Sequence, residues 1–220
     1  DLLFASNLSH DPMSADVTNT LPFIASFVGT ILITLSWVAA LKDRAEAALA
    51  DLAYQDELTG LANRRRLREG GRRLWERCRR DGSTFTLMTL DVDHFKLVND
   101  RFGHDEGDRV LAAIGTIFRD FAPQPDIAAR LGGEEFCLIF VGVDARTAHG
   151  FAEQLRWNFA EYVQLPDGSP VRFSAGIAQS MSIDASVEVV YSRADNALYE
   201  AKASGRDCTV IHQGRQRLVA

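Results

Sequence analysis

The stretch Phe85–Asp93, FTLMTLDVD, decides the fold. A short apolar run that ends in polar residues is typical of a buried strand. Asp91 and Asp93 end this run, so the strand would carry two carboxylates at its C-terminal end. Further along, the apolar runs IAARL and FCLIFV flank a GGEE segment, residues 132–135. Two glycines between apolar runs predict a hairpin.

Helical periodicity separates these strands. Three segments repeat apolar residues at every third or fourth position: 110–121, 148–162 and 187–204. Pro123 and Pro125 end the first helix, and Gly205 is expected to cap the last. Two further apolar runs predict strands: 171–180 and 208–211. The order β-α-β-β-α-β with added helices indicates an α+β domain of the ferredoxin-like or polymerase-palm type, with a central antiparallel sheet flanked by helices.

Residues 61–80 also have a helical pattern, and they carry nine arginines against two glutamates. Two interpretations fit this composition: a solvated helix face, or contact with the anionic inner leaflet of a membrane. Asp81-Gly82 predicts the end of the helix and a turn.

A long apolar segment precedes this domain. Residues 21–41 carry no charge, and a helix of 21 residues spans the ~30 Å hydrocarbon layer. The hydroxyls of residues such as Thr30 and Thr34 can bond to helix carbonyls, and Trp37 suits an interface. A buried core helix and a signal peptide are the alternatives, but a signal peptide has a basic leading flank. Here that flank carries Asp11 and Asp16 and no Lys or Arg.

Basic residues follow the segment, so the positive-inside rule places its C-terminal side in the cytoplasm. We expect five parts: an extracytoplasmic flank (1–20), a transmembrane helix (21–41), a linker helix (42–55), the α+β domain (56–213) and a tail (214–220). Within the linker, the spacing of Leu41, Ala45, Ala48 and Leu52 suits a coiled-coil seam, although a merely amphipathic helix fits equally well. Because the chain begins with Asp1 rather than Met, we expect it to be a fragment.

Composition excludes several classes of protein. The 220 residues are 46% hydrophobic and 25% charged, which is ordinary for a globular chain and excludes disorder throughout. The net charge of −6 argues against a general nucleic-acid coat protein, so no nucleic-acid partner is expected. Three cysteines are too few for a disulfide scaffold, and their spacing suggests no zinc site.

Two pairs of acids are candidate metal ligands. Asp91 and Asp93 end one strand, and Glu134 and Glu135 lie on the hairpin turn of the adjacent strand. Converging carboxylates suit hard divalent cations, and two such ions ~3.5–4 Å apart can clamp phosphates for in-line displacement. The glycines of the turn would let a nucleotide approach the backbone closely. An ordinary hairpin with solvated glutamates is the alternative.

Other polar residues nearby suit a nucleotide. Lys96 opens a helix beside the acids, and Lys202 and Arg206 lie four apart at the end of the last helix. These cations could contact phosphate, or could be ordinary surface residues. Asn99 and Asp108 offer an amide and a carboxylate. A carboxylate suits the N1–H and N2–H₂ donors of guanine, a donor pair that adenine lacks.

With these residues in view, the chain resembles the GGDEF family of diguanylate cyclases. Six motifs match in order: DELTGLANRR (56–65), DVDHFKLVND (91–100), FGHDEGDRVL (102–111), RLGGEEF (130–136), SAGIA (174–178) and ADNALYEAKASGRD (194–207). The match covers about residues 56–211. Six ordered motifs are far more specific than the GGEEF signature alone.

The resemblance implies roles for individual residues. The implied metal ligands, for two Mg²⁺ or Mn²⁺ ions per site, are Asp91, the Val92 carbonyl, Glu134 and Glu135. The implied catalytic residues are Glu134, Glu135 and Lys96, with Glu135 also a candidate for helping to deprotonate the attacking hydroxyl. The implied substrate-binding residues are Phe95, Lys96, Asn99, His104, Asp108, Gly132, Gly133, Lys202 and Arg206. Among these, Asn99 and Asp108 match the guanine-reading pair.

The implied reaction converts two GTP into cyclic di-GMP and two pyrophosphates. Each protomer of an antiparallel homodimer would hold one GTP, and positioning and charge neutralisation would do most of the catalysis. Receptors of the product are not expected to contact this chain directly. Two alternatives are a catalytically silent module that binds GTP and relays a membrane signal to a partner, and a cyclase that accepts ATP. The intact GGEEF turn argues against the first, and Asp108 argues against the second.

One motif departs from the family pattern. Many members carry an inhibitory product site, RxxD, five residues before the signature glycines. The corresponding residues here are 123–126, where Pro123 replaces the arginine and only Asp126 remains. Proline cannot supply a guanidinium, so we expect this site to be degenerate and feedback inhibition through it to be weak.

Overall fold

The computed structural model describes residues 12–120 and 125–212, and within the first range it describes side chains for 22–44 and from residue 54 onward. The chain divides into two compact units, Asp1–Ala53 and Tyr54–Ala220. We refer to the second as the catalytic unit, after the activity that the resemblance to the GGDEF family implies for it.

The first unit is formed by helix α1, Pro12–Tyr54, which has 43 residues. Its segment Pro22–Arg44 has a mean hydropathy of 2.1 and is not buried in the protein, so it is long and apolar enough to cross a membrane. The Thr30 hydroxyl donates to the Ser26 carbonyl at 2.8 Å, and Thr34 donates likewise to Thr30, as predicted.

The helix extends further than the sequence analysis predicted. It begins within the predicted flank (1–20) and continues without interruption through most of the predicted linker (42–55). Of the predicted coiled-coil seam only the exposed Leu41 has a described side chain, and Ala45, Ala48 and Leu52 lie outside the described side chains.

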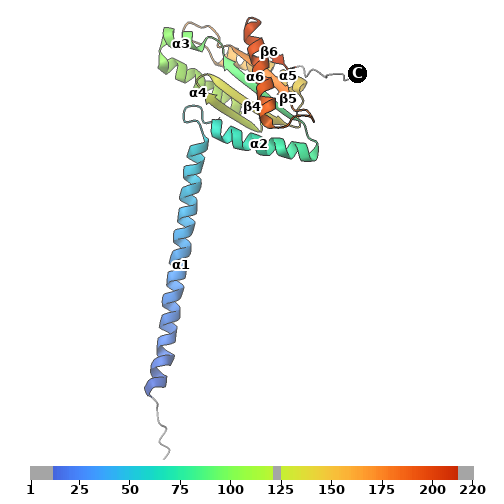
Figure 1. Cartoon of the computed structure of the whole chain (residues 1–220). Coiled ribbons are helices and arrows are strands. Elements are labelled where there is room, and N and C mark those ends of the chain that lie inside the picture. Colours follow the sequence, from blue (N-terminus) through green and yellow to red (C-terminus); the bar gives the residue numbers. More distant parts are fainter. Residues whose placement is uncertain (1–11, 121–124, 213–220) are drawn as a thin grey trace, which may run out of the picture. The chain divides into compact units, whose positions relative to one another are not determined.

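The catalytic unit is built on a six-stranded sheet (Figure 1). Its strands are β1 (Ala62–Asn63), β2 (Phe85–Val92), β3 (Ile127–Gly132), β4 (Glu135–Val141), β5 (Phe173–Gln179) and β6 (Thr209–Ile211). Its helices are α2 (Arg64–Asp81), α3 (Phe95–Phe102), α4 (His104–Asp120), α5 (Ala145–Tyr162) and α6 (Val187–Ala203). The strand order is β1-β3-β4-β2-β5-β6.

The predicted fold class is confirmed. The four central strands pair antiparallel, in the order of a ferredoxin-like sheet. The outer strand β1 pairs parallel with β3, and the outer strand β6 pairs parallel with β5. The sequence analysis did not predict these parallel pairs.

Helices cover both faces of the sheet and bury two apolar clusters (Figure 1). Residues of α3, α4 and α5, such as Ile114 and Phe159, pack on one face. Residues of α2 and α6, such as Trp75 and Val190, pack on the other. Since both faces are covered, all eight residues of β2 are buried, which explains why its sequence reads as one apolar run.

Several predicted boundaries shift for identifiable reasons. α2 begins at Arg64 rather than at residue 61, because the Asn63 side chain accepts from the N–H groups of the next turn. Gly82, with φ 75°, ends this helix as predicted. α4 begins at His104, earlier than the predicted residue 110. Gly205, with φ 112°, lies one residue past the observed cap of α6, Ser204.

Helix α6 packs very close to the sheet, and this packing places the end of the helix at the candidate site. A Cβ on Gly176 of β5 would lie 2.1 Å from the Ala194 carbonyl oxygen and 2.2 Å from the Leu198 nitrogen. Only glycine allows α6 to pack this closely on the sheet. One turn beyond Leu198, Lys202 reaches the end of β2.

Candidate active site

The acids of the two motifs meet where β2 ends. Asp91 of β2 lies directly opposite Glu135 of β4 in the antiparallel register, so the two side chains leave the sheet on one face. The Val92 N–H donates to the Glu134 carbonyl at 3.2 Å, which fixes the hairpin turn beside the end of β2. The predicted placement of these acids on adjacent central strands is therefore confirmed.

The turn itself is open on its outer side. Gly132 and Gly133 have φ values of 138° and 54°, which L side chains rarely adopt. A Cβ on either glycine would meet no heavy atom within 4 Å, so a ligand could approach the backbone there.

Arg130 binds the backbone of the turn and is itself paired with a carboxylate. The Arg130 Nε donates to the Gly133 carbonyl at 2.9 Å, and Arg130 Nη1 pairs with the Asp56 carboxylate at 3.2 Å. Asp56 also accepts from the Thr59 N–H and hydroxyl, at 2.9 and 2.7 Å. The sequence analysis gave no role to Asp56 or Arg130, although both lie in motifs that it quoted.

The pKa of Asp56 follows from these contacts. Burial acts to raise it, but the hydrogen bonds from Thr59 and the Arg130 guanidinium outweigh burial and hold the pKa below its ordinary value. The carboxylate is therefore the favoured form at this position.

Asp91 already has a cationic partner. Its carboxylate is largely buried, and the Lys202 Nζ lies 2.8 Å from Oδ2. The end of α6 therefore lies beside the end of β2 at Lys202.

The donors present fit a hard divalent cation. Among the residues that the structure describes, no group of three or more His, Cys, Asp and Glu side chains is close enough to hold a metal. The oxygen donors at the end of β2 are the Asp91 carboxylate, the Val92 carbonyl and, on the facing turn and strand, the Glu134 and Glu135 carboxylates. Mg²⁺ commonly binds one or two carboxylates and completes its shell with water and substrate phosphates. The ammonium group at Asp91 shows that this carboxylate accepts a cation.

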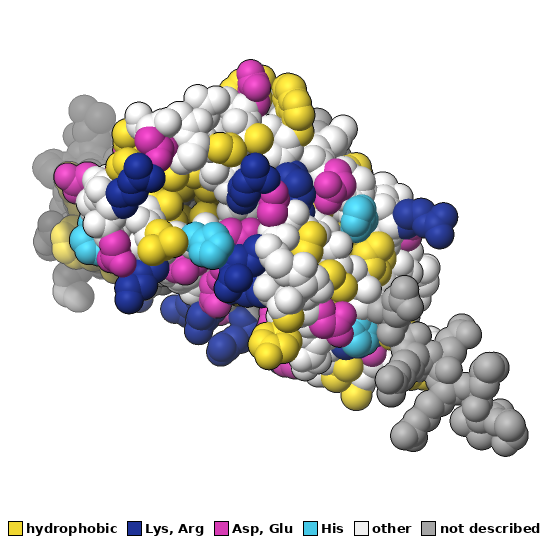
Figure 2. Space-filling view, turned by 90° about the horizontal axis from the view of Figure 1, so that it is seen from above, with side chains coloured by type: hydrophobic (Ala, Val, Ile, Leu, Met, Phe, Trp, Pro, Cys, Tyr) yellow, Lys and Arg dark blue, Asp and Glu magenta, His cyan; other side chains and the backbone are white. Residues whose placement is uncertain are grey.

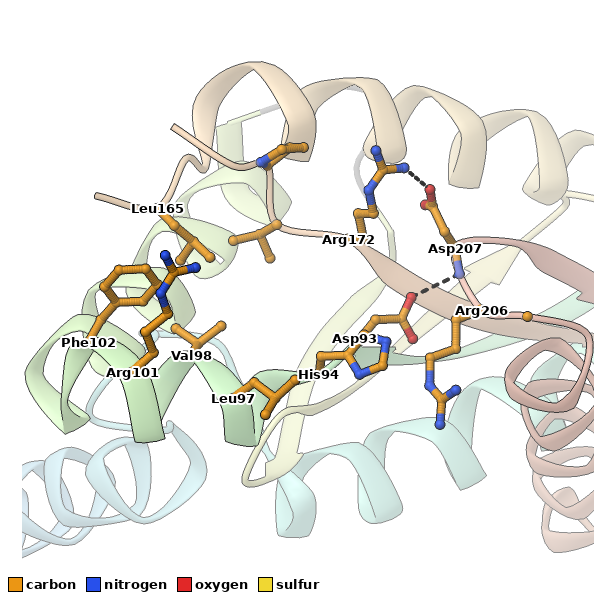
Figure 3. Close-up of a pocket in the computed structure, with 13 residues that line it drawn as sticks. Asp93, His94, Leu97, Val98, Arg101, Phe102, Leu165, Arg172, Arg206 and Asp207 are labelled. Carbon is orange, nitrogen blue, oxygen red and sulfur yellow. Dashed lines mark hydrogen bonds and ion pairs between the residues drawn. The ribbon is translucent and has the colours of Figure 1, made fainter. Parts of the chain in front are cut away.

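Asp93 behaves differently from Asp91, with which the sequence analysis grouped it. It is 8% exposed, and both carboxylate oxygens are used: Oδ1 accepts from the Ser174 hydroxyl at 2.8 Å, and Oδ2 accepts from the Asp207 N–H at 2.9 Å (Figure 3). Asp93 is therefore a structural carboxylate and not an open metal ligand.

A cavity of about 260 Å³ lies beside Asp93, between α3 and the segment after α6. Its lining includes Leu97, Val98, Arg172 and Arg206. Asp207 pairs with Arg172 at one side of the cavity, and the Arg206 side chain turns away from that pair (Figure 3). Figure 2 shows apolar side chains in a hollow of the catalytic unit, with basic side chains around it.

The predicted guanine-reading residues lie on α3 and α4 and are not among the residues that line this cavity. A Cβ on Gly107 would lie 2.0 Å from the Asn99 Oδ1 and 3.1 Å from the Phe95 ring, so Asn99 and Phe95 pack directly over Gly107. Asp108 is the next residue along α4. Asn99 therefore lies over the residue that precedes Asp108 in α4.

The remaining predicted site residues vary in exposure. Five are exposed: Lys96, His104, Asp108, Glu135 and Arg206. Glu134 and Lys202 are half-buried, and the Phe95 ring is buried. Exposure leaves the five side chains accessible to a ligand.

The degenerate inhibitory motif lies only partly in the described residues. Pro123 and Gln124 are outside them. The Asp126 carboxylate accepts from the Val141 N–H at 2.8 Å, so it caps the far end of the β3–β4 hairpin.

The palm-type antiparallel sheet therefore carries an acid at the end of a central strand, opposite a Gly-Gly-acid turn. Residues 53–208 match the family described as "Diguanylate cyclase, GGDEF domain". The chain therefore belongs to the GGDEF family.

Relatives and solved structures agree with this assignment. A diguanylate cyclase of Vibrio cholerae is 36% identical over 76% of this chain, and the match spans 53% of that relative's length. The coiled coil and GGDEF domain of DgcB from Caulobacter crescentus, solved with cyclic di-GMP, is 29% identical with a TM-score of 0.74 and covers 84% of this chain and 99% of its own. An active GGEEF domain of a Vibrio cholerae diguanylate cyclase is 35% identical with a TM-score of 0.67, over 70% of this chain and 98% of its own. A domain of this family thus exists as a separate folded unit.

Proposed function

We propose that this chain is a diguanylate cyclase that makes cyclic di-GMP and two pyrophosphates from two GTP. The observation that carries the proposal is the position of Asp91 directly opposite Glu135, beside an intact and accessible Gly132-Gly133 turn. The related cyclases support it, although this chain spans only about half the length of the Vibrio cholerae relative.

The proposed roles are those that membership of the GGDEF family implies for the matching residues. Asn99 and Asp108 read guanine, beside the buried Phe95. The Lys96, Lys202 and Arg206 cations neutralise the triphosphate. The turn glycines and His104 contact the nucleotide.

The acids prepare the reacting groups. Asp91, the Val92 carbonyl and Glu134 hold Mg²⁺ or Mn²⁺, with Glu135 either at the metals or helping to deprotonate the 3′-hydroxyl. Bound divalent ions supply a Lewis acid for the α-phosphate and lower the pKa of the attacking hydroxyl. Lys202, at 2.8 Å from Asp91, is placed to exchange that contact for a phosphate when substrate arrives.

Catalysis requires two chains, because each 3′-hydroxyl attacks the α-phosphate held by the other protomer. We propose that α1 supports this homodimer through the seam Leu41–Leu52, and that its segment Pro22–Arg44 anchors the protein in the bacterial inner membrane with the catalytic unit in the cytoplasm. Tethering two half-sites raises their effective concentration to the ~mM range.

The test is incubation of the catalytic unit, residues 54–220, and of the full chain with GTP and Mg²⁺, followed by nucleotide chromatography. Cyclic di-GMP is expected from both, and the specific activity of residues 54–220 is expected to rise with protein concentration. GTP binding without product, in both forms and at high concentration, would instead identify a silent module. Turnover of residues 54–220 that is independent of concentration would contradict the requirement for a dimer.

A further inference from the structure

Helix α2 carries a charge opposite to that of the rest of the chain. Its 18 residues include nine arginines against Glu69, Glu76 and Asp81, a net charge of six positive. The whole chain has a net charge of −6. All nine arginines are exposed. The fold therefore concentrates positive charge on one helix of an otherwise acidic protein.

Four of these arginines form a single stripe. Arg66, Arg73, Arg77 and Arg80 follow one another at spacings of seven, four and three, so they share one face of the helix. The opposite face, with Leu67, Gly71, Trp75 and Cys78, is buried in the protein. At ~1.5 Å per residue, the stripe is about 20 Å long. We call these four residues the arginine stripe.

The stripe lacks the ion pairs that neutralise its neighbours. Glu69 pairs with Arg65 at 3.2 Å, and Glu76 pairs with Arg72 at 2.9 Å, both at the side of the stripe. In the described part of the chain, none of the four stripe residues forms an ion pair within 4.0 Å. Like charges three or four residues apart repel each other on a helix. An external anionic surface would relieve that repulsion.

We propose that the arginine stripe binds the anionic headgroups of the membrane in which α1 is anchored. The proposal rests on the membrane anchor proposed above. Clusters of basic residues on the cytoplasmic side of a membrane span characteristically bind anionic lipid. Only nine residues, 45–53, separate the apolar segment Pro22–Arg44 from the catalytic unit in the sequence. The stripe begins only twelve residues after Tyr54.

The contact is electrostatic and lies at the surface of the bilayer. The apolar face of α2 is used by the core, so the helix has no apolar side to insert among acyl chains. Binding should therefore depend on anionic lipid and fall with salt.

Lipid contact would also bear on the catalytic turn. At the start of α2, Arg64 Nε donates to the Leu131 carbonyl at 3.2 Å, one residue before the Gly132-Gly133 turn. A membrane that binds α2 therefore also restrains Leu131, at the base of the β3–β4 hairpin.

Cosedimentation of residues 54–220 with vesicles tests the stripe without α1. We expect binding to vesicles of phosphatidylcholine that contain phosphatidylglycerol, loss of binding at high salt, and no binding to phosphatidylcholine alone. The variant Arg73→Gln/Arg80→Gln should lower the partition coefficient about 25-fold, taking about fivefold per arginine at the surface.

The matched control Arg101→Gln/Arg146→Gln removes the same charge from exposed positions on α3 and α5. It should retain most of the binding. Equal loss in both double variants would overturn the proposal, because binding would then follow net charge alone. Failure to bind anionic vesicles at physiological salt would overturn it as well, as would preferential binding of a short DNA duplex over those vesicles.

The anchor is tested separately by flotation of the full chain with phosphatidylcholine vesicles, to which the stripe contributes nothing. Failure of flotation would refute the anchor, and the vesicle experiment on residues 54–220 would still decide whether the stripe recognises anionic lipid.

Discussion

The Asp93 Oδ2 accepts a hydrogen bond from the backbone N–H of Asp207 at 2.9 Å, across 114 residues of sequence. Asp207 and its neighbour Arg206 have φ values of 47° and 68°, an αL conformation that is costly for residues other than glycine. Arg156 also pairs with Asp207, at 2.6 Å. Asp93 therefore helps to hold a strained turn whose exposed side chain, Arg206, is a proposed phosphate ligand.

Replacement of Asp93 by Asn tests this positioning role. An amide has one acceptor oxygen and no charge, so even where its N–H₂ donates to the Ser174 hydroxyl, the charge-assisted bond from the Asp207 N–H is lost. We expect KM for GTP to rise about tenfold, with a smaller fall in kcat, in line with the loss of one charge-assisted hydrogen bond. Initial rates at varied GTP measure this.

Ser174→Ala is the matched comparison, because it removes one hydrogen bond and leaves the bond to Asp207 intact. It should lower the free energy of unfolding by about 1 kcal/mol and change KM little. If both variants raise KM equally, the change in KM does not come from the bond between Asp93 and Asp207.

Gly107 is expected to control the guanine-reading pair. In Gly107→Ala, the new Cβ would lie 2.0 Å from the Asn99 Oδ1 and displace that amide. Displacement should weaken GTP binding about tenfold, as a lost hydrogen bond to a buried group would, and reduce the preference for GTP over ATP. Competition between the two nucleotides in a binding assay measures the change.

Gly150→Ala is the control for this change, since a Cβ there meets no heavy atom within 4 Å on α5. It should leave nucleotide binding unchanged and raise stability slightly, because alanine favours helix. Unchanged nucleotide selectivity in Gly107→Ala would show that Asn99 does not read the base.

Much of the fold could be predicted from local pattern. β2 and the β3–β4 hairpin are apolar runs bounded by turn residues, and the carboxylates at their ends follow directly from the sequence. Strand β1 could not be predicted, because a two-residue strand has no periodicity. The start of α4 was also missed, since its first turn, HDEG, has no apolar repeat.

The site was harder to predict where it depends on distant contacts. Asp91 lies in β2 and Asp93 directly after it, and the two look equivalent in the sequence, but Ser174, which binds Asp93, is 81 residues away. The Asp56–Arg130 pair likewise joins residues 74 apart. Local pattern carries no information on such pairings, which arise only when the sheet forms.

The metal-ligand assignment predicts loss of synthesis in Asp91→Asn and in Glu134→Gln. Both changes keep the side-chain volume, and Lys202, which loses its partner in the first variant, is 34% exposed and can be solvated. The free energy of unfolding should therefore change by no more than about 1 kcal/mol. Chromatography of the products and urea unfolding measure the two effects, and chelation of divalent ions should abolish synthesis by the unchanged protein. Substantial cyclic di-GMP production by either variant would contradict the assignment.

Product inhibition should be weak at saturating GTP. Pro123 stands where the inhibitory site has an arginine, and the Asp126 carboxylate is engaged with the Val141 N–H. A product phosphate would meet no guanidinium at position 123 and a carboxylate that repels it. Titration with cyclic di-GMP should therefore show competition with GTP and no tight noncompetitive component.

Asp126→Asn keeps the acceptor for Val141 and removes the charge, so it separates structure from binding. Tight noncompetitive inhibition that is present in the unchanged protein and absent in this variant would show that an arginine from elsewhere completes the site.

The Asp56–Arg130 pair should make stability and activity depend on acid pH. Since the Asp56 pKa is lowered from 3.8 in the folded protein, the unfolded chain binds the proton more readily. The contribution to stability is then fully present above about pH 4 and is lost as the pH falls through the lowered folded value. Asp56→Asn should lower the free energy of unfolding by about 1 kcal/mol at neutral pH, and this difference from the unchanged protein should shrink below pH 4.

Asp56→Asn should also lower kcat, because Arg130 fixes the Gly133 carbonyl of the catalytic turn. Glu57→Gln removes the same charge from an exposed neighbour and should do neither. Urea unfolding at several pH values, with rates at neutral pH, measures both effects. A difference in stability that persists unchanged below pH 4 would show that the Asp56 charge is not what Arg130 requires.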